Sequence, residues 1–396
     1  MDQCRHRVAL ALAVAMLPMA WFWLTLGPNL AALWLVGGAL GLSLHHAGFS
    51  FAGGIRLFIT QRRGALLRAQ LVMLGLASLL ILPVVANGSL FGAPARGLVF
   101  PVGLASLLGA FLFGVGMQLG GGCGSGTLYG AGAGNARLGL TLVFFIAGAT
   151  MAAWQTDLWA AWPSLPAISL LGHFGLWPSL GASLVLIMLA YLAVRWLEQR
   201  RHGHVAVLSW RAGSRRWGEL RAGRWPLLWG ALALAVLNLA TLWLAGRPWA
   251  ITAAFPLWGS RAIEALGWDD PAFWPYWEDP TRTEALLRPV LSDRTTIMDI
   301  GMLAGAAGAA ILAGRAARSW RLHPGEVAAS IIGGLLLGIG SILGSGCNIS
   351  AWVSGTASGS LHGWVWLLPA LLGNAAGIAL RPRFGLDAPS RHALPS

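Results

Sequence analysis

Residues 114–132 read GVGMQLGGGCGSGTLYGAG, a glycine-rich stretch that places Cys123 inside an otherwise apolar region. A second stretch, GIGSILGSGC at 338–347, lies 224 residues downstream of GVGMQLGGGC and ends on Cys347. Six of the ten aligned positions are identical, and they include both cysteines. Glycine adopts backbone conformations that other residues avoid and lets a ligand approach the main chain closely. The sequence therefore predicts two related breaks, each with a thiol.

The whole chain has the composition of a membrane protein. Of its 396 residues, 56% are hydrophobic and 10% are charged, and the mean hydropathy is +0.66. A helix needs about 20 apolar residues to cross the hydrocarbon core. Stretches near that length lie at 8–27, 30–46, 69–86, 98–119, 138–155, 176–195, 226–246, 297–314, 327–343 and 361–380. We therefore predict an all-α polytopic membrane protein with about ten membrane-crossing helices. The first stretch could instead be a signal peptide, but it is long and has no clear cleavage site.

The arginines predict the orientation. All 27 basic residues are Arg, and the formal net charge is +13. They gather before the first span, before the third, and at 195–225, 315–321 and 381–383, whereas 156–175 contains no Arg and 268–296 has six acids against three Arg. Because cytoplasmic loops carry the excess of basic residues, both termini are predicted to be cytoplasmic. This grouping also argues against nucleic acid as the partner.

The topology and the repeated motif together predict two inverted halves. The span before Cys123 is expected to run from outside to inside, and the span before Cys347 in the opposite direction. Such repeats place a substrate site near the bilayer midplane, where the halves meet. The predicted organisation is an N-terminal transmembrane repeat (1–195), a basic cytoplasmic linker (196–225), and a C-terminal inverted transmembrane repeat (226–396) with an acidic periplasmic loop near 268–296.

Each break is predicted to start a short re-entrant half-helix, capped by Ser125 or Thr127 in the first half and by Asn348 or Ser350 in the second. Broken backbone within hydrocarbon is tolerated where it is buried in protein or lines a cavity. The start of a helix favours an anion, and a thiol there either donates a weak hydrogen bond or becomes a nucleophilic thiolate. The predicted substrate path comprises Gly121, Gly122, Cys123, Gly124, Ser125, Thr127, Ser345, Gly346, Cys347, Asn348 and Ser350.

Other features of the sequence allow two explanations each. Glycine runs in membrane helices also indicate close packing, and a buried cysteine is often a small hydrophobic residue. Asp299, near the start of the eighth span, either couples protons or lies at the surface, and His45 and His46 either relay protons or lie at the interface. The stretch PWAITAAFPLWG (248–259) reads as a further re-entrant segment or as packing. No metal-ligand spacing and no nucleotide-binding loop is visible, so no cofactor is predicted.

The motifs GVGMQLGGGCGSG and GIGSILGSGCNIS, together with GRPWAITAAFPLWGSRAIEALGW (246–268), resemble the YeeE/YedE family of bacterial inner-membrane proteins over nearly the whole chain. The resemblance implies an hourglass of inverted repeats that imports thiosulfate or a related small sulfur anion, with some members associated with selenium. It also implies that cysteines along a narrow path relay the substrate by S–H contacts. Cys123 and Cys347 match two of these positions.

The sequence departs from the family pattern at a third position. The family commonly has a Phe-Cys pair upstream of an arginine, and the matching stretch here has Phe49, Ser50 and Arg56. A serine hydroxyl can still bind an oxyanion, so Ser50 stays on the predicted path. Arg56 either attracts the anion at the inner mouth or snorkels to the interface.

Three classes of function follow. The favoured one is a transporter, not an enzyme, for thiosulfate or a related sulfur anion, with a selenium compound as an alternative cargo. The second is a membrane-embedded thiol enzyme resembling a sulfurtransferase, against which the lack of a nearby base counts. The third is a non-transporting assembly subunit. The expected partners are the anion and the lipid bilayer. The basic linker is expected to bind either anionic lipid head groups or, as the resemblance implies, a small cytosolic sulfur-carrier protein.

Overall fold

The computed structural model describes residues 2–210, 225–314 and 321–387. Part of the predicted linker (211–224), part of an arginine-rich gap (315–320) and the end of the C-terminal repeat (388–396) lie outside these residues. Ten segments of the described chain are long and apolar enough to cross a membrane. The predicted all-α polytopic fold is thereby confirmed. The long helices are α1 (Asp2–Thr25), α2 (Pro28–Ala47), α4 (Ala65–Asn87), α5 (Leu104–Gly120), α7 (Ala136–Trp154), α10 (Leu176–His202), α12 (Leu227–Ala245), α15 (Arg294–Leu312), α16 (Pro324–Leu343) and α18 (Leu361–Leu380).

Shorter elements connect or interrupt the long helices. The short helices are α3 (Phe51–Gln61), α6 (Gly124–Gly132), α8 (Asp157–Ala160), α9 (Leu170–Phe174), α13 (Ala254–Ala265), η1 (Pro271–Phe273), η2 (Pro275–Trp277), α14 (Pro280–Leu287), η3 (Val290–Ser292), the π-helical η4 (Asn348–Ser354), α17 (Gly355–Ala357) and η5 (Arg381–Phe384). Two short antiparallel strand pairs join β1 (Ser89–Leu90) to β2 (Ala93–Pro94) and β3 (Val102–Gly103) to β4 (Ser164–Leu165).

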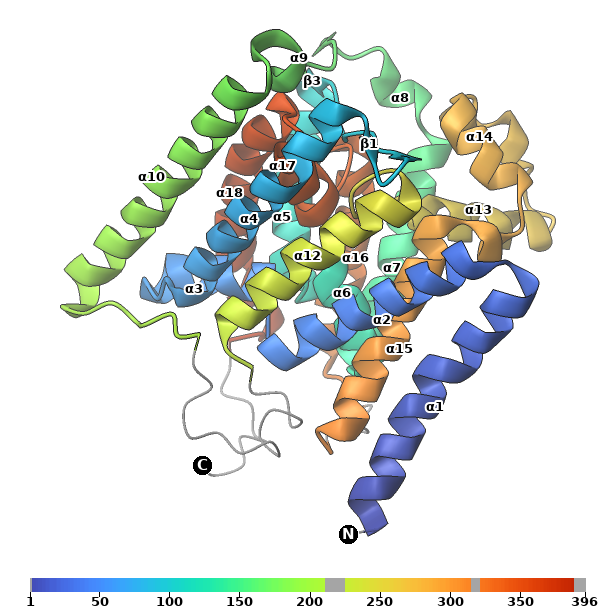
Figure 1. Ribbon diagram of the computed structural model, residues 1–396, viewed down its shortest axis with the longest axis horizontal. Helices are drawn as coiled ribbons and strands as arrows, with labels where there is room; N and C mark the ends of the chain where they lie inside the picture. Colours follow the sequence, from blue (N-terminus) through green and yellow to red (C-terminus); the bar gives the residue numbers. More distant parts are fainter. Residues whose placement is uncertain (1, 211–224, 315–320, 388–396) are drawn as a thin grey trace.

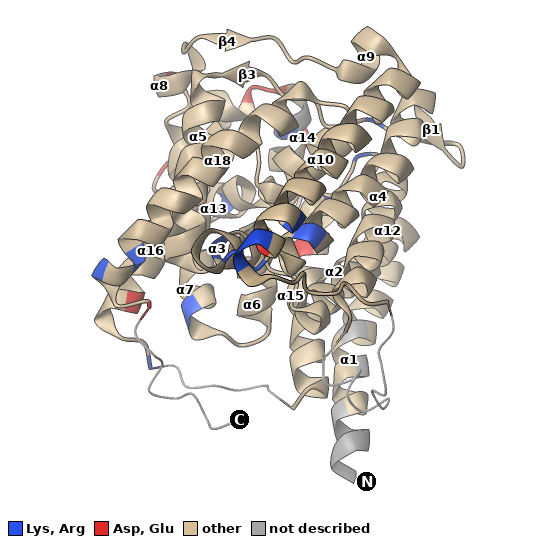
Figure 2. Ribbon diagram, turned by 90° about the vertical axis from the view of Figure 1, so that its left-hand side faces the viewer, with Lys and Arg blue, Asp and Glu red and all other residues tan. Residues whose placement is uncertain are grey.

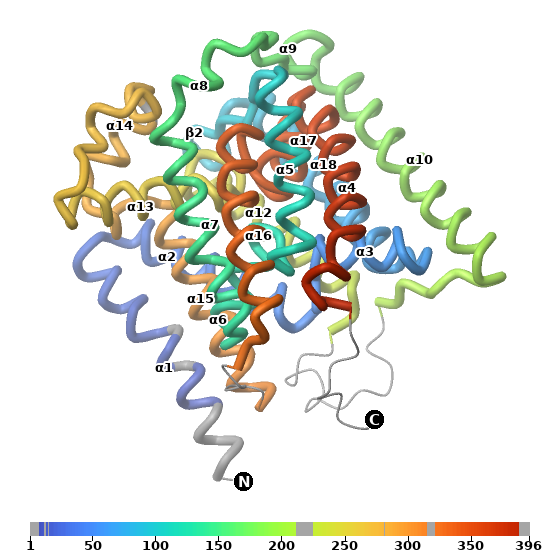
Figure 3. Tube along the Cα trace, turned by 180° about the vertical axis from the view of Figure 1, so that it is seen from behind, coloured from blue at the N-terminus to red at the C-terminus, as the bar shows by residue number. Residues whose placement is uncertain are grey.

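The helix pairs follow one pattern in both halves of the chain. Helix α16 packs against α7 and α5, α18 against α5, α15 against α2, and α12 against α4 and α2. We treat α5 and α16, α7 and α18, α2 and α12, and α4 and α15 as counterparts. When each helix in a packed pair is replaced by its counterpart, the result is again one of the packed pairs. Helices α1 and α10 also fit this exchange as counterparts, because α10 packs against α4 and α1 packs against α15. They lie on opposite flanks of the molecule (Figures 1 and 3).

Helices α5 and α16 run antiparallel with their backbones in contact. A Cβ built on Gly109 would lie 2.2 Å from the Gly344 nitrogen, and one built on Gly333 would lie 2.2 Å from the Gly120 nitrogen. Glycine lets two membrane helices approach this closely. The packing explanation therefore holds for these glycines. The antiparallel direction is the one that an inverted repeat requires, although the inversion of the complete halves stays a prediction.

Four short segments break the long-helix pattern. Helices α3, α6, α13 and η4 have 11, 9, 12 and 7 residues, too few for a helix to cross a bilayer alone. Helix α6 lies in the lower half of the molecule and α17, which continues η4, in the upper half (Figures 1 and 3). The chain thus interrupts its long helices where the sequence places the cysteine motifs.

Two predicted boundaries differ from the structure. The fourth span was expected from 98, but α5 begins at Leu104, because Val102 and Gly103 pair with Leu165 and Ser164 as an extended segment. The linker was expected from 196, but α10 continues to His202. Its last turns are held by a buried ion pair between Arg68 and Glu198, with 2.9 Å between Nη2 and Oε2.

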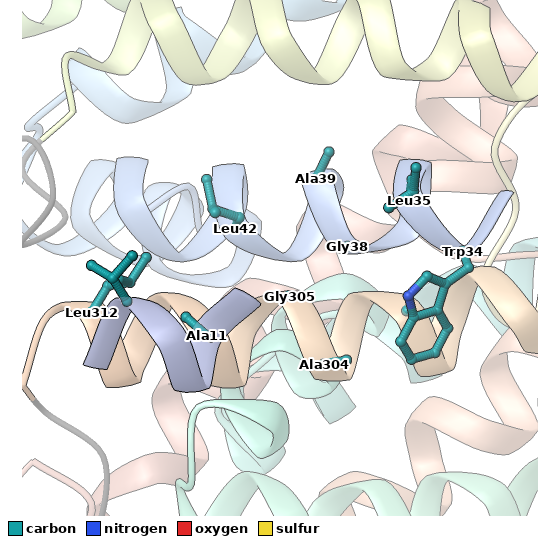
Figure 4. A pocket seen from close by; sticks show the side chains of 12 residues that line it. Ala11, Trp34, Leu35, Gly38, Ala39, Leu42, Ala304, Gly305 and Leu312 are labelled. Carbon is teal, nitrogen blue, oxygen red and sulfur yellow. The ribbon is translucent and has the colours of Figure 1, made fainter. Parts of the chain in front are cut away.

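The arginine-bearing segments and the apolar groove lie in particular parts of the fold. Arginine-bearing segments gather around α3 and near the lower ends of α7 and α16 (Figure 2). An apolar groove of about 270 Å³ runs between α1, α2 and α15, beside Trp34, Gly38 and Gly305 (Figure 4). It contains neither cysteine, so the predicted path lies elsewhere.

Candidate functional site

The first break places the Cys123 thiol at the start of a helix. Gly121 has φ +88°, a left-handed conformation that ends α5, and Cys123 is extended and forms the N-cap of α6. The Gly126 N–H donates to Cys123 Sγ at 3.4 Å, and Ser125 Oγ lies 3.3 Å from the same sulfur. The expected cap at Ser125 or Thr127 is therefore wrong, because the helix begins two residues earlier and the thiol itself accepts the bond.

The second break has the same geometry with different capping. Ser345, which aligns with Gly121, also has a left-handed φ of +53°, and Gly346 follows at φ +141°. Cys347 is the N-cap of η4, and its backbone N–H donates to Ser350 Oγ at 3.0 Å. Ser350 thus takes part in the cap, as one of the two expected residues, whereas Asn348 lies inside η4.

The two breaks touch each other. A Cβ built on Gly124 would lie 3.3 Å from Cys347 Sγ and 3.6 Å from Thr252 Cγ2. Thr252 belongs to the predicted third re-entrant stretch, just before α13. Cys123 and Cys347 are 1% and 0% exposed, so both thiols lie inside the protein, where α6, η4 and the segment before α13 meet.

Ser50 lies at the start of α3, next to Phe51, whose backbone contacts the Cys123 thiol. It caps α3, since the Gly53 N–H donates to Ser50 Oγ at 3.0 Å. The Tyr129 hydroxyl lies within hydrogen-bonding range of Ser50, and the Phe51 backbone N–H within range of the Cys123 thiol. The structure therefore places Cys123 close both to Cys347 and to the start of α3, where Ser50 is the N-cap.

Amide side chains inside the spans hold α3 in place, and the sequence analysis missed them. Gln70 Nε2 donates to Ser50 O at 3.0 Å, and Gln118 Nε2 donates to Ala52 O at 3.1 Å and to Asn374 Oδ1 at 2.6 Å. If these amides were lost, the backbone carbonyls would have no hydrogen-bond partner, which is energetically costly within hydrocarbon. The available signal was an amide in an otherwise apolar span, which usually binds across helices.

Several polar atoms on α6, on η4 and in the segment before α13 are buried without a hydrogen-bond partner among the described residues. They include Thr127 Oγ1, Asn348 Oδ1, Trp249 Nε1 and Trp352 Nε1. Buried polar atoms are normally paired, and an indole N–H is a donor only. The elements around the thiols thus carry hydrogen-bond donors and acceptors that a small polar ligand could satisfy.

Arginines surround the lower end of α5. Arg381 Nη1 donates to Gln118 O at 2.8 Å, and Arg137 Nη2 donates to Leu119 O. Arg56, on α3, lies within electrostatic range of Arg381, and the Arg137 guanidinium is 3.5 Å from where a Gly121 Cβ would be. The first break therefore has a cluster of positive charge beside it, of which the sequence indicated Arg56 alone.

No group of three or more His, Cys, Asp or Glu side chains in the described parts of the chain is placed to hold a metal ion. The site consists instead of two thiols, one hydroxyl, helix-start N–H groups and nearby guanidinium groups. These groups can bind an anion by hydrogen bonds and charge.

Comparison with known proteins gives consistent matches. The profile of the sulphur transport family matches residues 46–376. The probable transporter YedE of Escherichia coli (strain K12) is 26% identical over 153 residues, which cover 39% of this chain and 37% of that protein. The thiosulfate transporter TsuA of Spirochaeta thermophila is 25% identical over 275 residues, covering 68% of this chain and 76% of that protein.

A second TsuA, from Escherichia coli (strain K12), is 23% identical over 359 residues, covering 86% of this chain and 91% of that protein. The match to the YedE proteins, in contrast, covers only 37% of their length. The family profile, however, extends from the end of α2 into α18 and includes both cysteine breaks. The protein therefore belongs to the sulphur transport family and is a multi-pass membrane protein.

Proposed function

We propose that this protein imports thiosulfate, or a closely related small sulfur anion, across the bacterial inner membrane, with both termini in the cytoplasm. Membership of a sulphur transport family and the similarity to two thiosulfate transporters support this cargo. The observation that carries the proposal is the contact between the breaks. Gly124 lies against the Cys347 thiol, and the residue that precedes Gly124 in the chain is Cys123.

The chemistry of the two thiols suits a sulfur anion. A neutral S–H is a weak donor, so it can bind a polarisable anion without holding it tightly. Conduction requires binding that is favourable enough to admit the ion and weak enough to release it. With both thiols buried, the anion would leave water and exchange it for S–H, backbone N–H and indole N–H donors.

The proposed order of contacts is Cys347, Cys123, Ser50 and then Arg56. Each of the first three residues stands at the start of a short helical segment, where backbone N–H groups favour negative charge. At Arg56 and its neighbours Arg137 and Arg381, the anion would meet fixed positive charge at the cytoplasmic end. A cytosolic sulfur carrier docking near the basic linker would receive the cargo there.

The electrical work of import is large. Moving one elementary charge across 100 mV costs about 2.3 kcal/mol, so bringing a dianion such as thiosulfate into an inside-negative cell costs about 4.6 kcal/mol per 100 mV. Without coupling, this would keep the internal concentration on the order of a thousandfold below the external one. The proposed import therefore needs either rapid consumption of the cargo or a coupled ion.

Counterflow in proteoliposomes tests the proposed cargo. Vesicles containing the purified protein and unlabelled thiosulfate are diluted into labelled thiosulfate, with selenite, selenate and sulfate as competitors. We expect label to enter faster than into protein-free vesicles, with unlabelled thiosulfate competing best. No exchange by correctly inserted protein would refute the thiosulfate assignment, and stronger competition by a selenium anion would move the cargo to selenium. A covalent persulfide that forms without exchange would favour the thiol enzyme.

A further inference from the structure

Asp299 is a buried carboxyl without a partner inside a membrane-spanning helix. It is 0% exposed, and neither Oδ1 nor Oδ2 accepts a hydrogen bond from any described residue. It lies in α15, within a segment apolar enough to span the membrane. Of the two explanations left by the sequence, a surface position is therefore wrong.

The carboxyl lies on the face of α15 that packs toward the short helices. Asp299 is four residues from both Thr295 and Leu303, so these three share one face. The Leu303 carbonyl lies 2.3 Å from where a Cβ on Gly132 of α6 would be, and Thr296 Oγ1 accepts a bond from Trp258 of α13 at 2.9 Å. Asp299 therefore stands about one helical turn from the contact with α6, the helix that begins at Cys123.

The other faces of α15 are occupied differently, by α2 on an adjacent face and by the apolar groove across the helix. Met298 and Met302 pack against Gly37 and Gly41 of α2, and the apolar groove lies beside Gly305 (Figure 4). The groove is lined almost wholly by apolar groups and offers no charged group to the carboxyl. Asp299 belongs to the interior, together with the elements that form the thiol site.

A lone carboxylate in such surroundings is unfavourable. Burying an ionised carboxyl without a partner costs several kcal/mol, so the group is neutral unless a cation or water reaches it. Asp293, at the start of α15, lies within electrostatic range and carries the same sign of charge. The other ionisable side chains described on the elements packed against α15 are His45 and His46 on α2, Tyr129 on α6, and Arg261 and Glu264 on α13.

None of the cationic side chains among these neighbours bonds to Asp299. Arg261 donates to Glu264 and to the carbonyls of Leu286 and Arg288. At the outer end of α15, Arg294 donates to Ala245 O at 2.7 Å, and Arg247 donates to Thr295 Oγ1 at 2.9 Å. No described cationic side chain is therefore placed to neutralise Asp299 when it is ionised, which leaves a proton as its counter-charge.

We propose that Asp299 is the proton-binding site that couples anion import to the proton gradient. Its carboxylate takes one proton from the outer solution as the anion enters, forming a carboxylic acid, and gives the same proton to the cytoplasm on release. No other reactant is needed. One proton per dianion halves the charge that is moved and adds the pH gradient as a driving force. This inference rests on the proposed import of a small sulfur dianion.

The test compares the parent with Asp299→Asn, which has nearly the same shape but cannot release a proton. Asp157→Asn, at an exposed carboxyl outside the spans, is the matched control. Proteoliposomes receive labelled thiosulfate with and without an acidic exterior, and counterflow is measured on the same vesicles. Infrared difference spectra between acidic and alkaline pH record the C=O band of a protonated carboxyl without any cargo.

We expect an acidic exterior to raise accumulation by about tenfold for each unit of pH difference in the parent and in Asp157→Asn. Asp299→Asn should keep counterflow, lose this response, and lack one titrating C=O band. Equal accumulation by Asp299→Asn and the parent, or a parent spectrum with no band that depends on Asp299, would overturn the proposal. Absence of counterflow in the parent would instead refute the thiosulfate cargo, and the infrared band would still decide whether Asp299 binds a proton.

Discussion

Gly124 lies directly against the thiol of Cys347, since a Cβ on Gly124 would be 3.3 Å from Cys347 Sγ. The contact joins two motifs 224 residues apart in the sequence. It also means that the residue after one thiol limits the space around the other.

Gly124→Ala should therefore impair transport while leaving the protein folded. The added methyl group is too close to Cys347 by a few tenths of an ångström, and overpacking of this kind costs about 1 kcal/mol, which the thiol relieves by moving. We expect thiosulfate uptake to fall on the order of tenfold. Gly139→Ala is the control, because a Cβ there would meet nothing within 4 Å. Equal uptake by the two variants would mean that the Gly124 contact does not limit the path.

Ser50→Cys should increase thiosulfate uptake. Cys123 shows that a thiol can cap a short helix in this protein, so α3 should still begin at Phe51. A third S–H donor would resemble the family pattern, and one improved weak contact corresponds to about a twofold to fivefold change. Ser50→Ala, which loses the cap, should destabilise α3 by about 1 kcal/mol and lower uptake. If Ser50→Cys transports less than the parent, the hydroxyl is the fitted group and the cargo at this position is not recognised through sulfur.

Gln118 and Asn374 should be energetically coupled. Their side chains are 0% exposed and joined by a 2.6 Å hydrogen bond between Nε2 and Oδ1. Hydrogen bonds between membrane helices contribute about 0.6 to 1.7 kcal/mol. In a double-mutant cycle with Gln118→Leu and Asn374→Leu, we expect a coupling free energy of about 1 kcal/mol in denaturant unfolding. Gln118→Leu should also slow uptake, because its amide holds Ala52 O at the start of α3. A coupling near zero would show that the bond does not position α3.

Much of the fold follows from the sequence because hydrocarbon imposes strong constraints. A span must be about 20 apolar residues long, so the ten predicted stretches correspond to the ten candidate spans in the described chain. The positions of the breaks were also predictable, since glycine permits the left-handed conformation that Gly121 adopts. The extended start at Val102 was not, because the partner strand lies more than 60 residues away in sequence.

The contacts of the site were less predictable than its residues. Ser125 and Thr127 are ordinary capping residues, but the backbone before them leaves Cys123 extended and lets its sulfur accept the bond. Asp299 lies only five residues into α15, so sequence distance could not separate a surface position from a buried one. Arg137 and Arg381 approach the first break through tertiary packing, which no local pattern indicates. The roles of all these residues in transport stay predictions.

Uptake of labelled thiosulfate by cells that lack their own importers tests the central claim most directly. The parent is compared with Cys123→Ala and Cys347→Ala, and with Cys4→Ala near the start of α1 as a control for cysteine loss. Losing a hydrogen bond to a charged group costs about 1.5 to 3 kcal/mol, so each of the first two variants should lower uptake by at least about tenfold. Cys4→Ala should transport like the parent. Normal uptake by Cys123→Ala and Cys347→Ala at equal expression would contradict a path past the two thiols.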